Sequence, residues 1–195
     1  MSGGHASEPP SDWIVRWAYL VPTGARVLDL ACGGGRHARF FAARGNPVTA
    51  CDRDAAPFAG LSTVGGIAVR QADLEDGNPW PFADAQFGAI VVTNYLHRPL
   101  FAPIAGTLVK GGVLLYETFV SGNERYGKPS NPRFLLEKDE LLTAFGSGLV
   151  VVAFEQGRVT RAKPALIQRL CAIRADTLDH DLEPTEGPDS VKISG

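Results

Sequence analysis

One glycine-rich stretch of the chain combines residue types that could bind a nucleotide. VLDLACGGGRHARFFAARG, residues 27–45, carries Asp29 inside an apolar run that breaks into three consecutive glycines. Glycines after a strand allow positive φ and let the backbone approach a ligand closely. The six residues from Gly33 to Ala38 also fit the loose G-x-G-x-x-A pattern of dinucleotide-binding proteins. The glycines therefore predict a nucleotide site and leave the kind of nucleotide open.

Two further aspartates follow the next apolar runs. Asp52 ends VTACD and Asp73 lies in QADLED, each at the carboxyl end of an expected strand, where open parallel sheets bind ligands. Asp29 suits a cationic amino group, Asp52 can accept hydrogen bonds from ribose hydroxyls, and Asp73 can accept one from the exocyclic amine of adenine. Three carboxylates around one pocket would repel a pyrophosphate but tolerate a sulfonium and an ammonium. The pattern favours a sulfonium cofactor over a dinucleotide.

Short β-branched runs alternating with helical runs are expected to position these residues. The alternation is typical of βαβ units and a parallel sheet, with strands expected at 26–31, 47–51, 67–71, 87–93 and 112–119 and helices at 36–44, 55–61 and 99–109. A further helix is expected at 137–145, followed by strands 149–155 and 165–175. The short basic connection 156–164 between these strands suggests an antiparallel pair that closes the sheet edge.

The ends of the chain are expected to lie outside the domain. Residues 1–10 are predicted to be a disordered lead and residues 176–195, which are acidic and poor in aromatics, a flexible tail. Residues 11–175 are expected to form a single domain. Ser11 can cap a short helix that carries Trp13 and Arg16.

Composition narrows the class of protein. The 195 residues are 45% hydrophobic and carry a net charge of -2, with a pI near 6.1, so no basic face points to nucleic acid. No apolar run approaches the roughly 20 residues that a membrane helix needs, and the N-terminus lacks the pattern of a secretory signal; a cytoplasmic protein is expected. Cys32, Cys51 and Cys171 have no metal-binding spacing, and we expect buried thiols and no metal site.

Over roughly residues 13–175 the chain resembles class I S-adenosylmethionine (SAM)-dependent methyltransferases. The matching pieces, in order, are VLDLACGGG, VTACDRD, QADLED and LVKGGVLLYETF. The resemblance implies a Rossmann-like three-layer α/β sandwich with a seven-stranded, mostly parallel sheet whose last strand is antiparallel. The N-terminal helix and GNERYGKPSNPRFLL further resemble a group of small bacterial methyltransferases related to tellurite-resistance methyltransferases.

The resemblance also implies roles for residues around the cofactor. Gly33 and Gly35 would pack under the methionine part of SAM, Asp52 would hold the ribose, and Asp73 the adenine amine with Leu74 near the ring. Arg16 would pair with the cofactor carboxylate, although an ordinary packing helix is equally consistent with its position. Further cofactor-binding candidates are Asp29, Ala31, Arg53 and Asn94, with Ala31 standing where the family usually has its first glycine.

The segment TNYLHRP, where the family lines the methyl-transfer pocket, supplies the catalytic candidates. His97 is the candidate base because an unperturbed imidazole titrates near neutrality; the alternative is a structural histidine at a helix start. Tyr95 lines the pocket or packs in the core. The segment does not match the Asn/Asp-Pro-Pro-aromatic pattern, and no cysteine follows it, which disfavours a covalent mechanism on cytosine.

The polar segment 121–134, SGNERYGKPSNPRF, is the candidate substrate loop. Arg125, Tyr126 and Arg133 lie on the loop that leaves the fifth strand beside the expected pocket, and Glu117 is expected to anchor one of the arginines. Their charge suits an anionic acceptor; the alternative is a solvated loop that closes over the cofactor. We therefore expect a SAM-dependent methyltransferase acting on a small molecule. The alternatives are an RNA or protein methyltransferase working with a partner, and a SAM-binding module without catalysis.

Overall fold

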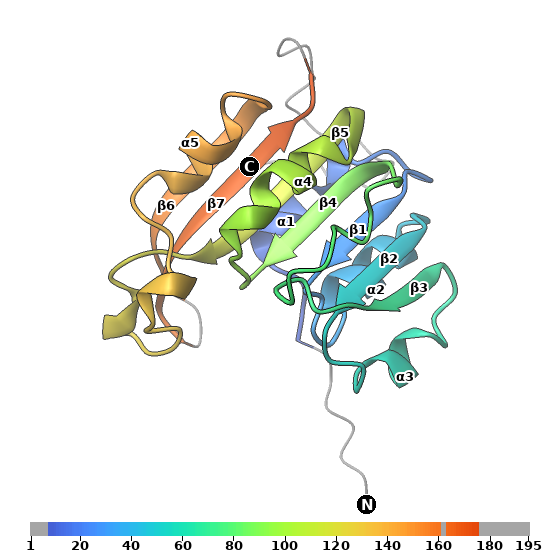
Figure 1. The fold of residues 1–195 in the computed structure, drawn as a ribbon, viewed down its shortest axis with the longest axis horizontal. Coiled ribbons are helices and arrows are strands. Elements are labelled where there is room, and N and C mark those ends of the chain that lie inside the picture. The colour runs from blue at the N-terminus through green and yellow to red at the C-terminus, as the bar shows by residue number, and fades with distance from the viewer. Residues whose placement is uncertain (1–7, 161–162, 176–195) are drawn as a thin grey trace, which may run out of the picture.

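The chain folds around one seven-stranded sheet in the order β3-β2-β1-β4-β5-β7-β6 (Figure 1). A computed structural model describes residues 8–160 and 163–175. The strands are β1 Val27–Leu30, β2 Val48–Asp52, β3 Ile67–Gln71, β4 Phe87–Thr93, β5 Leu108–Phe119, β6 Val150–Val159 and β7 Ala165–Ile173. β7 pairs antiparallel with both β5 and β6, whereas the pairs among β1 to β5 are parallel. The expected mostly parallel sheet with an antiparallel last strand is confirmed.

Helices cover both faces of the sheet. They are α1 Asp12–Trp17, α2 Arg36–Ala43, α3 Phe58–Leu61, α4 Phe101–Gly106 and α5 Glu140–Phe145, with 3-10 turns η1 Ala18–Leu20, η2 Arg98–Leu100, η3 Asn123–Arg125 and η4 Pro132–Phe134. The buried residues of α1, α2 and α3 belong to one hydrophobic cluster and those of α4 and α5 to another, and Figure 1 shows α4 and α5 on the near face. The three-layer sandwich expected from the resemblance is confirmed.

Alternation along β1 assigns its side chains to these two layers. Leu28 and Leu30 belong to the cluster under α4 and α5, whereas Val27 belongs to the cluster under α1, α2 and α3. Successive side chains of a strand point to opposite faces, so Asp29 lies on the side of Val27. The residue therefore faces the helix layer that contains α2.

Several element boundaries differ from those expected. The helix expected at 99–109 divides into η2 and α4, and β5 already begins at Leu108 rather than at residue 112. The register between β4 and β5 shifts near Phe87, where Gly111 has φ 79° and a Cβ on Gly112 would lie 2.8 Å from the Val109 oxygen. The sequence predicted a loop between a helix and a strand at this place. The two glycines instead permit a β-bulge, and β5 continues through it.

The remaining shifts affect shorter elements. Of the helix expected at 55–61, only the last part forms, as α3. At its start Asp54 Oδ1 accepts a hydrogen bond from Ala56 N at 2.9 Å, which holds these residues in a turn. The helix expected at 137–145 is the shorter α5, and β6 continues to Val159 into the expected connection.

The expectations for the ends of the chain lie mostly outside the described residues, which exclude 1–7 and 176–195. At the start of α1, Ser11 is the N-cap, and its hydroxyl accepts a hydrogen bond from Trp13 N at 3.3 Å. This cap was predicted from the sequence and is confirmed. All three cysteines are free and buried, as expected. No helix among the described residues is long and apolar enough to cross a membrane.

Candidate active site

A pocket of about 640 Å³ opens at the carboxyl ends of the parallel strands. From β1 the chain passes through α2 to β2, which lies on one side of β1. β4 lies on the other side of β1 and is followed in the sheet by β5, so the strand order reverses between β1 and β4. Open α/β sheets bind ligands at such a reversal of strand order. The walls come from the ends of β1 to β5, from the start of α2, from the segment 121–134 and from Glu8, which precedes α1. The lining residues are Glu8, Ala31, Cys32, Gly33, Gly34, Arg36, Asp52, Arg53, Ala72, Asp73, Leu74, Glu75, Thr93, Asn94, Tyr95, Leu96, Phe119, Pro129 and Phe134.

The pocket brings together most of the residues predicted to bind a cofactor. Those that line it are Ala31, Gly33, Asp52, Arg53, Asp73, Leu74 and Asn94, together with the catalytic candidate Tyr95. The predicted residues that do not line it are Asp29, Gly35, Arg16, His97, Glu117, Arg125, Tyr126 and Arg133. The predicted residues that line the pocket lie mainly at the ends of strands. Those that do not line it lie at positions where the direction of the side chain depends on how helices and loops pack.

The glycine turn forms the floor of the pocket beside β1. Ala31 has φ 52° and Gly33 has φ 50°, in the left-handed region that favours glycine. The backbone N–H of Gly33 donates to Asp52 Oδ2 at 2.8 Å. This bond ties the turn to the end of β2 and fixes the carboxylate over the pocket. The positive φ of Ala31 explains why the family usually has a glycine at this position.

Asp52 and Asp73 present carboxylate oxygens from neighbouring strand ends. Asp52 Oδ1 accepts a hydrogen bond from Asp54 N at 3.0 Å, and Asp73 Oδ1 accepts one from Glu75 N at 2.9 Å. These Asx turns fix the direction of each side chain at the pocket wall. A carboxylate oxygen has two lone pairs, so both groups retain the capacity to accept hydrogen bonds from ligand hydroxyls or an amine.

Asp29 has a different environment from the one expected. It is 1% exposed and its Oδ2 accepts a hydrogen bond from Ala38 N at 2.8 Å, in the first turn of α2. The N-cap residue of α2 is Gly35, which offers no side-chain oxygen, so Asp29 satisfies that helix end from the adjacent strand. Burial is the main cause that raises the pKa of Asp29 from 3.8 to about 8. In this structure the side chain caps α2 and does not line the pocket.

Gly35 also serves packing rather than the pocket wall. Its φ is 73°, and a Cβ at this position would lie 2.3 Å from Leu61 Cδ2 of α3. Only a residue without a side chain allows α3 this close approach. The turn needs Gly35 for the contact between α2 and α3.

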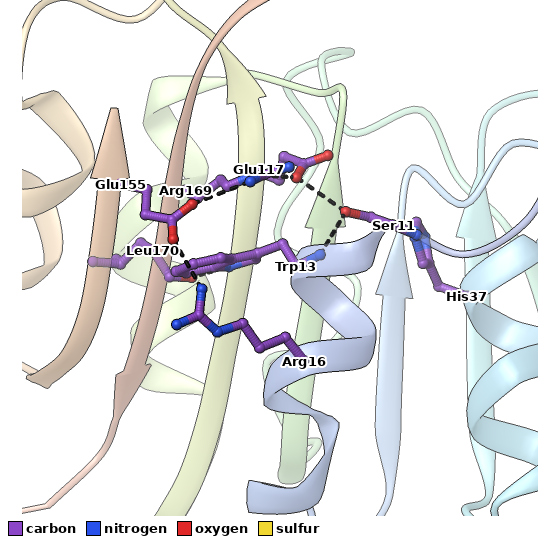
Figure 2. A network of polar contacts seen from close by, with 8 residues as sticks. All are labelled: Ser11, Trp13, Arg16, His37, Glu117, Glu155, Arg169 and Leu170. Carbon is purple, nitrogen blue, oxygen red and sulfur yellow. Dashed lines mark hydrogen bonds and ion pairs between the residues drawn. The ribbon is translucent and has the colours of Figure 1, made fainter. Parts of the chain in front are cut away.

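The side chain of Arg16 lies away from the pocket, in the network of Figure 2. Its Nη1 pairs with Glu155 Oε1 at 3.0 Å, so the expected pairing with a cofactor carboxylate is not seen. Trp13, on the same helix, is buried in the core, and its Nε1 donates to Leu170 O at 3.4 Å. The α1 helix is therefore a packing helix, the alternative that the sequence left open.

Glu117 binds residues other than the loop arginines. It is 1% exposed, and its Oε2 accepts hydrogen bonds from Arg169 Nε at 2.7 Å and from Ser11 Oγ at 3.0 Å (Figure 2). Arg169 Nη1 also donates to Glu155 Oε2 at 3.1 Å. The expected anchor for Arg125 or Arg133 is therefore not observed, and Glu117 instead joins β5, β7 and the start of α1.

The segment 121–134 contributes apolar residues to the pocket. Pro129 and Phe134 line it, whereas the predicted donors Arg125, Tyr126 and Arg133 do not. Arg125 Nε donates to Gly122 O at 3.2 Å within its own turn. The expected contact of these three donors with an anionic acceptor stays a prediction, since none of them lines the pocket in this structure.

Arg98 fixes the position of this segment. Its Nη1 and Nη2 donate to the carbonyl oxygens of Arg133 and Leu135 at 3.2 and 3.0 Å, and its Nε pairs with Glu140 Oε1 at 2.6 Å. The hydrogen bond to Glu140 is the main cause that raises the pKa of Arg98. The guanidinium therefore holds Phe134 beside the end of β4.

Tyr95, Glu75 and His97 lie together at one side of the pocket. Burial, followed by the carboxylates of Glu75 and Asp73, raises the pKa of Tyr95, so its phenol is protonated at neutral pH. His97 does not line the pocket, but its Nδ1 lies 4.0 Å from Glu75 Oε2, and Glu75 does line it. Glu75 was missed by the sequence reasoning, although it lies two residues after Asp73.

Two other charged residues that line the pocket were missed. Arg36 follows the glycine turn directly, so its position in the sequence could have indicated it. Glu8 lies within the stretch expected to be disordered, and its Oε2 is 3.2 Å from Arg36 Nη1. Nothing in the sequence around Glu8 indicates this contact. Among the described residues, no group of His, Cys, Asp and Glu side chains could hold a metal ion.

The strand order, the antiparallel β7 and the ligand site at the carboxyl edge define the class I methyltransferase fold. Residues 27–112 match the family model described as a methyltransferase domain. The match covers less than half of the chain, and the fold is the one seen in the solved methyltransferase structures described below.

Two curated relatives are similar to part of the chain. The trans-aconitate 2-methyltransferase of Methylobacterium nodulans is 30% identical over 112 residues, which are 55% of this chain and 43% of that protein. The ribosomal protein L11 methyltransferase of Bordetella parapertussis is 36% identical over 119 residues, which are 57% of this chain and 37% of that protein. The chain spans less than half the length of these two relatives.

Solved structures share the fold at low sequence identity. TehB of Haemophilus influenzae superposes with a TM-score of 0.70 at 17% identity, covering 88% of this chain and 64% of that one. The 1,6-didemethyltoxoflavin-N1-methyltransferase of Burkholderia thailandensis, solved with its substrate and S-adenosylhomocysteine, gives a TM-score of 0.62 at 20% identity, covering 84% of this chain and 76% of that one.

Proposed function

We propose that this protein transfers a methyl group from SAM to a small-molecule acceptor. The observation that carries the proposal is that Asp52, Asp73 and the glycine turn line one pocket. These groups can accept hydrogen bonds from a ribose and an adenine amine beside a floor without bulky side chains. The bound S-adenosylhomocysteine of the Burkholderia enzyme, which shares the fold, supports SAM as the cofactor.

The pocket residues fit the parts of SAM. Asp52 would accept hydrogen bonds from the ribose hydroxyls, and Asp73 one from the adenine amine, with Leu74 against the ring. The methionine part would lie over Gly33 and Ala31. SAM supplies an electrophilic methyl group on a sulfonium. Since methyl transfer is an in-line displacement, the chain's main task is to align the acceptor with that methyl.

The remaining wall supports an acceptor with an apolar body. Leu96, Phe119, Pro129 and Phe134 line the side of the pocket formed by the ends of β4 and β5 and by the segment 121–134. Tyr95, whose phenol is protonated at neutral pH and hydrogen-bonded to Glu75, would lie beside the acceptor and could accept a hydrogen bond from it. His97 stays the candidate base and would act through Glu75, which lines the pocket and whose Oε2 lies 4.0 Å from His97 Nδ1.

Two measurements test the proposal. Titration calorimetry with SAM, S-adenosylhomocysteine and NADP is expected to show binding of both sulfur compounds and none of NADP. Methyl transfer from tritiated SAM is then measured with small carboxylates, amines, phenols and thiols. Binding of NADP with neither sulfur compound would overturn the cofactor assignment, and SAM binding without transfer to any acceptor would favour the non-catalytic module.

A protein acceptor is the second candidate. The specific observation in its favour is the 36% identity to the Bordetella ribosomal protein L11 methyltransferase. Adding purified L11 and bulk ribosomal protein to the same transfer assay separates the two candidates. Label on protein with no label on small molecules would replace our proposal with this one.

A further inference from the structure

Arg36 presents a guanidinium to the pocket directly beside the glycine turn. It is the first residue of α2 and lines the pocket with Gly33 and Gly34. Only 18% of its side chain is exposed. A guanidinium held at a pocket wall offers a rigid fork of donors that matches a carboxylate. At the start of a helix, the aligned peptide dipoles also favour an anion.

The carboxylate that Arg36 contacts in this structure belongs to the chain itself. Arg36 Nη1 donates to Glu8 Oε2 at 3.2 Å and to Pro9 O at 3.4 Å. The Glu8 side chain is 84% exposed, and ion pairs with an exposed partner contribute little free energy. A ligand carboxylate can therefore replace Glu8 at small cost.

The segment that carries Glu8 is anchored at its other end. We call residues 8–11 the N-terminal strap. Ser11 N donates to His37 Nε2 at 3.1 Å, and Ser11 Oγ donates to Glu117 Oε2 at 3.0 Å (Figure 2). Consecutive residues of α2, Arg36 and His37, thus hold the two ends of the strap. The buried anchor at Ser11 keeps Glu8 within reach of Arg36.

We infer that Arg36 binds the carboxylate of the amino-acid part of SAM, and that Glu8 competes with this carboxylate for Arg36. The inference rests on the proposed function, which places the methionine part of SAM over the glycine turn. Arg16, the sequence-based candidate for this carboxylate, is paired with Glu155 away from the pocket. Because Glu8 occupies Arg36 for part of the time, the apparent affinity for the cofactor is lower than that of a free site.

Titration calorimetry with two ligands tests both halves of the inference. S-adenosylhomocysteine has the amino-acid carboxylate, whereas 5′-methylthioadenosine has the adenosine and the sulfur but no amino-acid part. Arg36→Gln is expected to weaken binding of S-adenosylhomocysteine about 10- to 100-fold, the range for a hydrogen bond to a charged group. It is expected to leave the affinity for 5′-methylthioadenosine within about twofold. Arg36→Lys, which keeps the charge without the fork, should give a smaller loss.

The exposed partner supplies the matched variant. Glu8→Gln is expected to strengthen binding of S-adenosylhomocysteine about two- to fivefold, the effect of removing an exposed ion pair, and to have no effect on 5′-methylthioadenosine. In the Arg36→Gln background, Glu8→Gln should bring no gain, because the two effects share one interaction.

Three outcomes would overturn the inference. Equal weakening of both ligands by Arg36→Gln would show that Arg36 only supports the shape of the site. Weaker binding of S-adenosylhomocysteine by Glu8→Gln would show that Glu8 contacts the ligand ammonium instead of competing. Failure of the wild-type protein to bind either sulfur compound would remove the proposed function and this inference with it, whereas wild-type binding with an unselective Arg36 effect removes the inference alone.

Discussion

The buried carboxyl of Asp29 makes the stability of the protein depend on pH in an unusual direction. Burial raises its pKa from 3.8 to about 8, against the opposing effect of the hydrogen bond from Ala38 N. Between pH 4 and pH 8 the folded protein therefore retains a proton that the unfolded chain has lost. The free energy of unfolding falls as pH rises through this window, and it levels off above the folded pKa.

Asp29→Asn removes this titration and keeps an oxygen that can accept the Ala38 hydrogen bond. One pKa unit corresponds to about 1.4 kcal/mol, so the cost of keeping Asp29 protonated reaches roughly 4 kcal/mol at pH 7. We expect the Asn variant to be more stable than the wild type by up to about that amount at pH 7, with the difference vanishing near pH 4.

Urea unfolding of both proteins from pH 4 to pH 8, followed by circular dichroism, measures this difference. Asp29→Ala is the control: it loses the oxygen that caps α2 and should be about 1–2 kcal/mol less stable than the Asn variant at every pH. A wild type that gains stability over the Asn variant as pH rises would refute the reasoning, since it would show an ionised Asp29 stabilised by α2. A large loss of S-adenosylhomocysteine affinity in the Asn variant would restore its role in cofactor binding.

Four further substitutions have expected outcomes. Gly35→Ala should lower the free energy of unfolding by roughly 2 kcal/mol or more, because it combines positive φ with a steric clash. Gly34→Ala, which meets no atom within 4 Å, should change it by less than about 1 kcal/mol; thermal unfolding compares the two. Asp52→Asn should weaken binding of S-adenosylhomocysteine about 10- to 100-fold by calorimetry, and an unchanged affinity would place the ribose elsewhere. Glu117→Gln should cost roughly 2–3 kcal/mol in urea unfolding, because Arg169 loses the buried negative charge of Glu117 and keeps only the more exposed carboxylate of Glu155; an unaltered midpoint would contradict this.

The positions of Asp52 and Asp73 could be predicted from the sequence. Both follow short β-branched runs separated by helical segments, and the carboxyl ends of parallel strands meet at one edge of a sheet. The N-cap at Ser11 and the antiparallel closing strands could also be predicted from short stretches of sequence. In each case the decisive pattern is local, and the fold that it implies has few alternatives.

The side-chain directions at the site were decided by tertiary packing. The sequence placed Asp29 beside the glycine turn, but β-strand alternation points it to the layer of α2 rather than into the pocket. The segment 121–134 has no periodicity, so its course is set by tertiary contacts: Leu166 N on β7 donates to Asn123 Oδ1 at 3.0 Å, and Arg98 donates to the carbonyl oxygens of Arg133 and Leu135. With these contacts Phe134 lines the pocket, whereas the charged residues of the segment do not.

The amino-acid sequence by itself thus determined the fold class and the edge of the sheet where the pocket opens, and it predicted a sulfonium cofactor there. These follow from hydrophobic period, glycine position and the order of the aspartates. The contact of Glu8 with Arg36, 28 residues apart, was decided only by the tertiary structure. Contacts between segments distant in sequence depend on how helices and loops pack on the sheet, and no local pattern encodes that path.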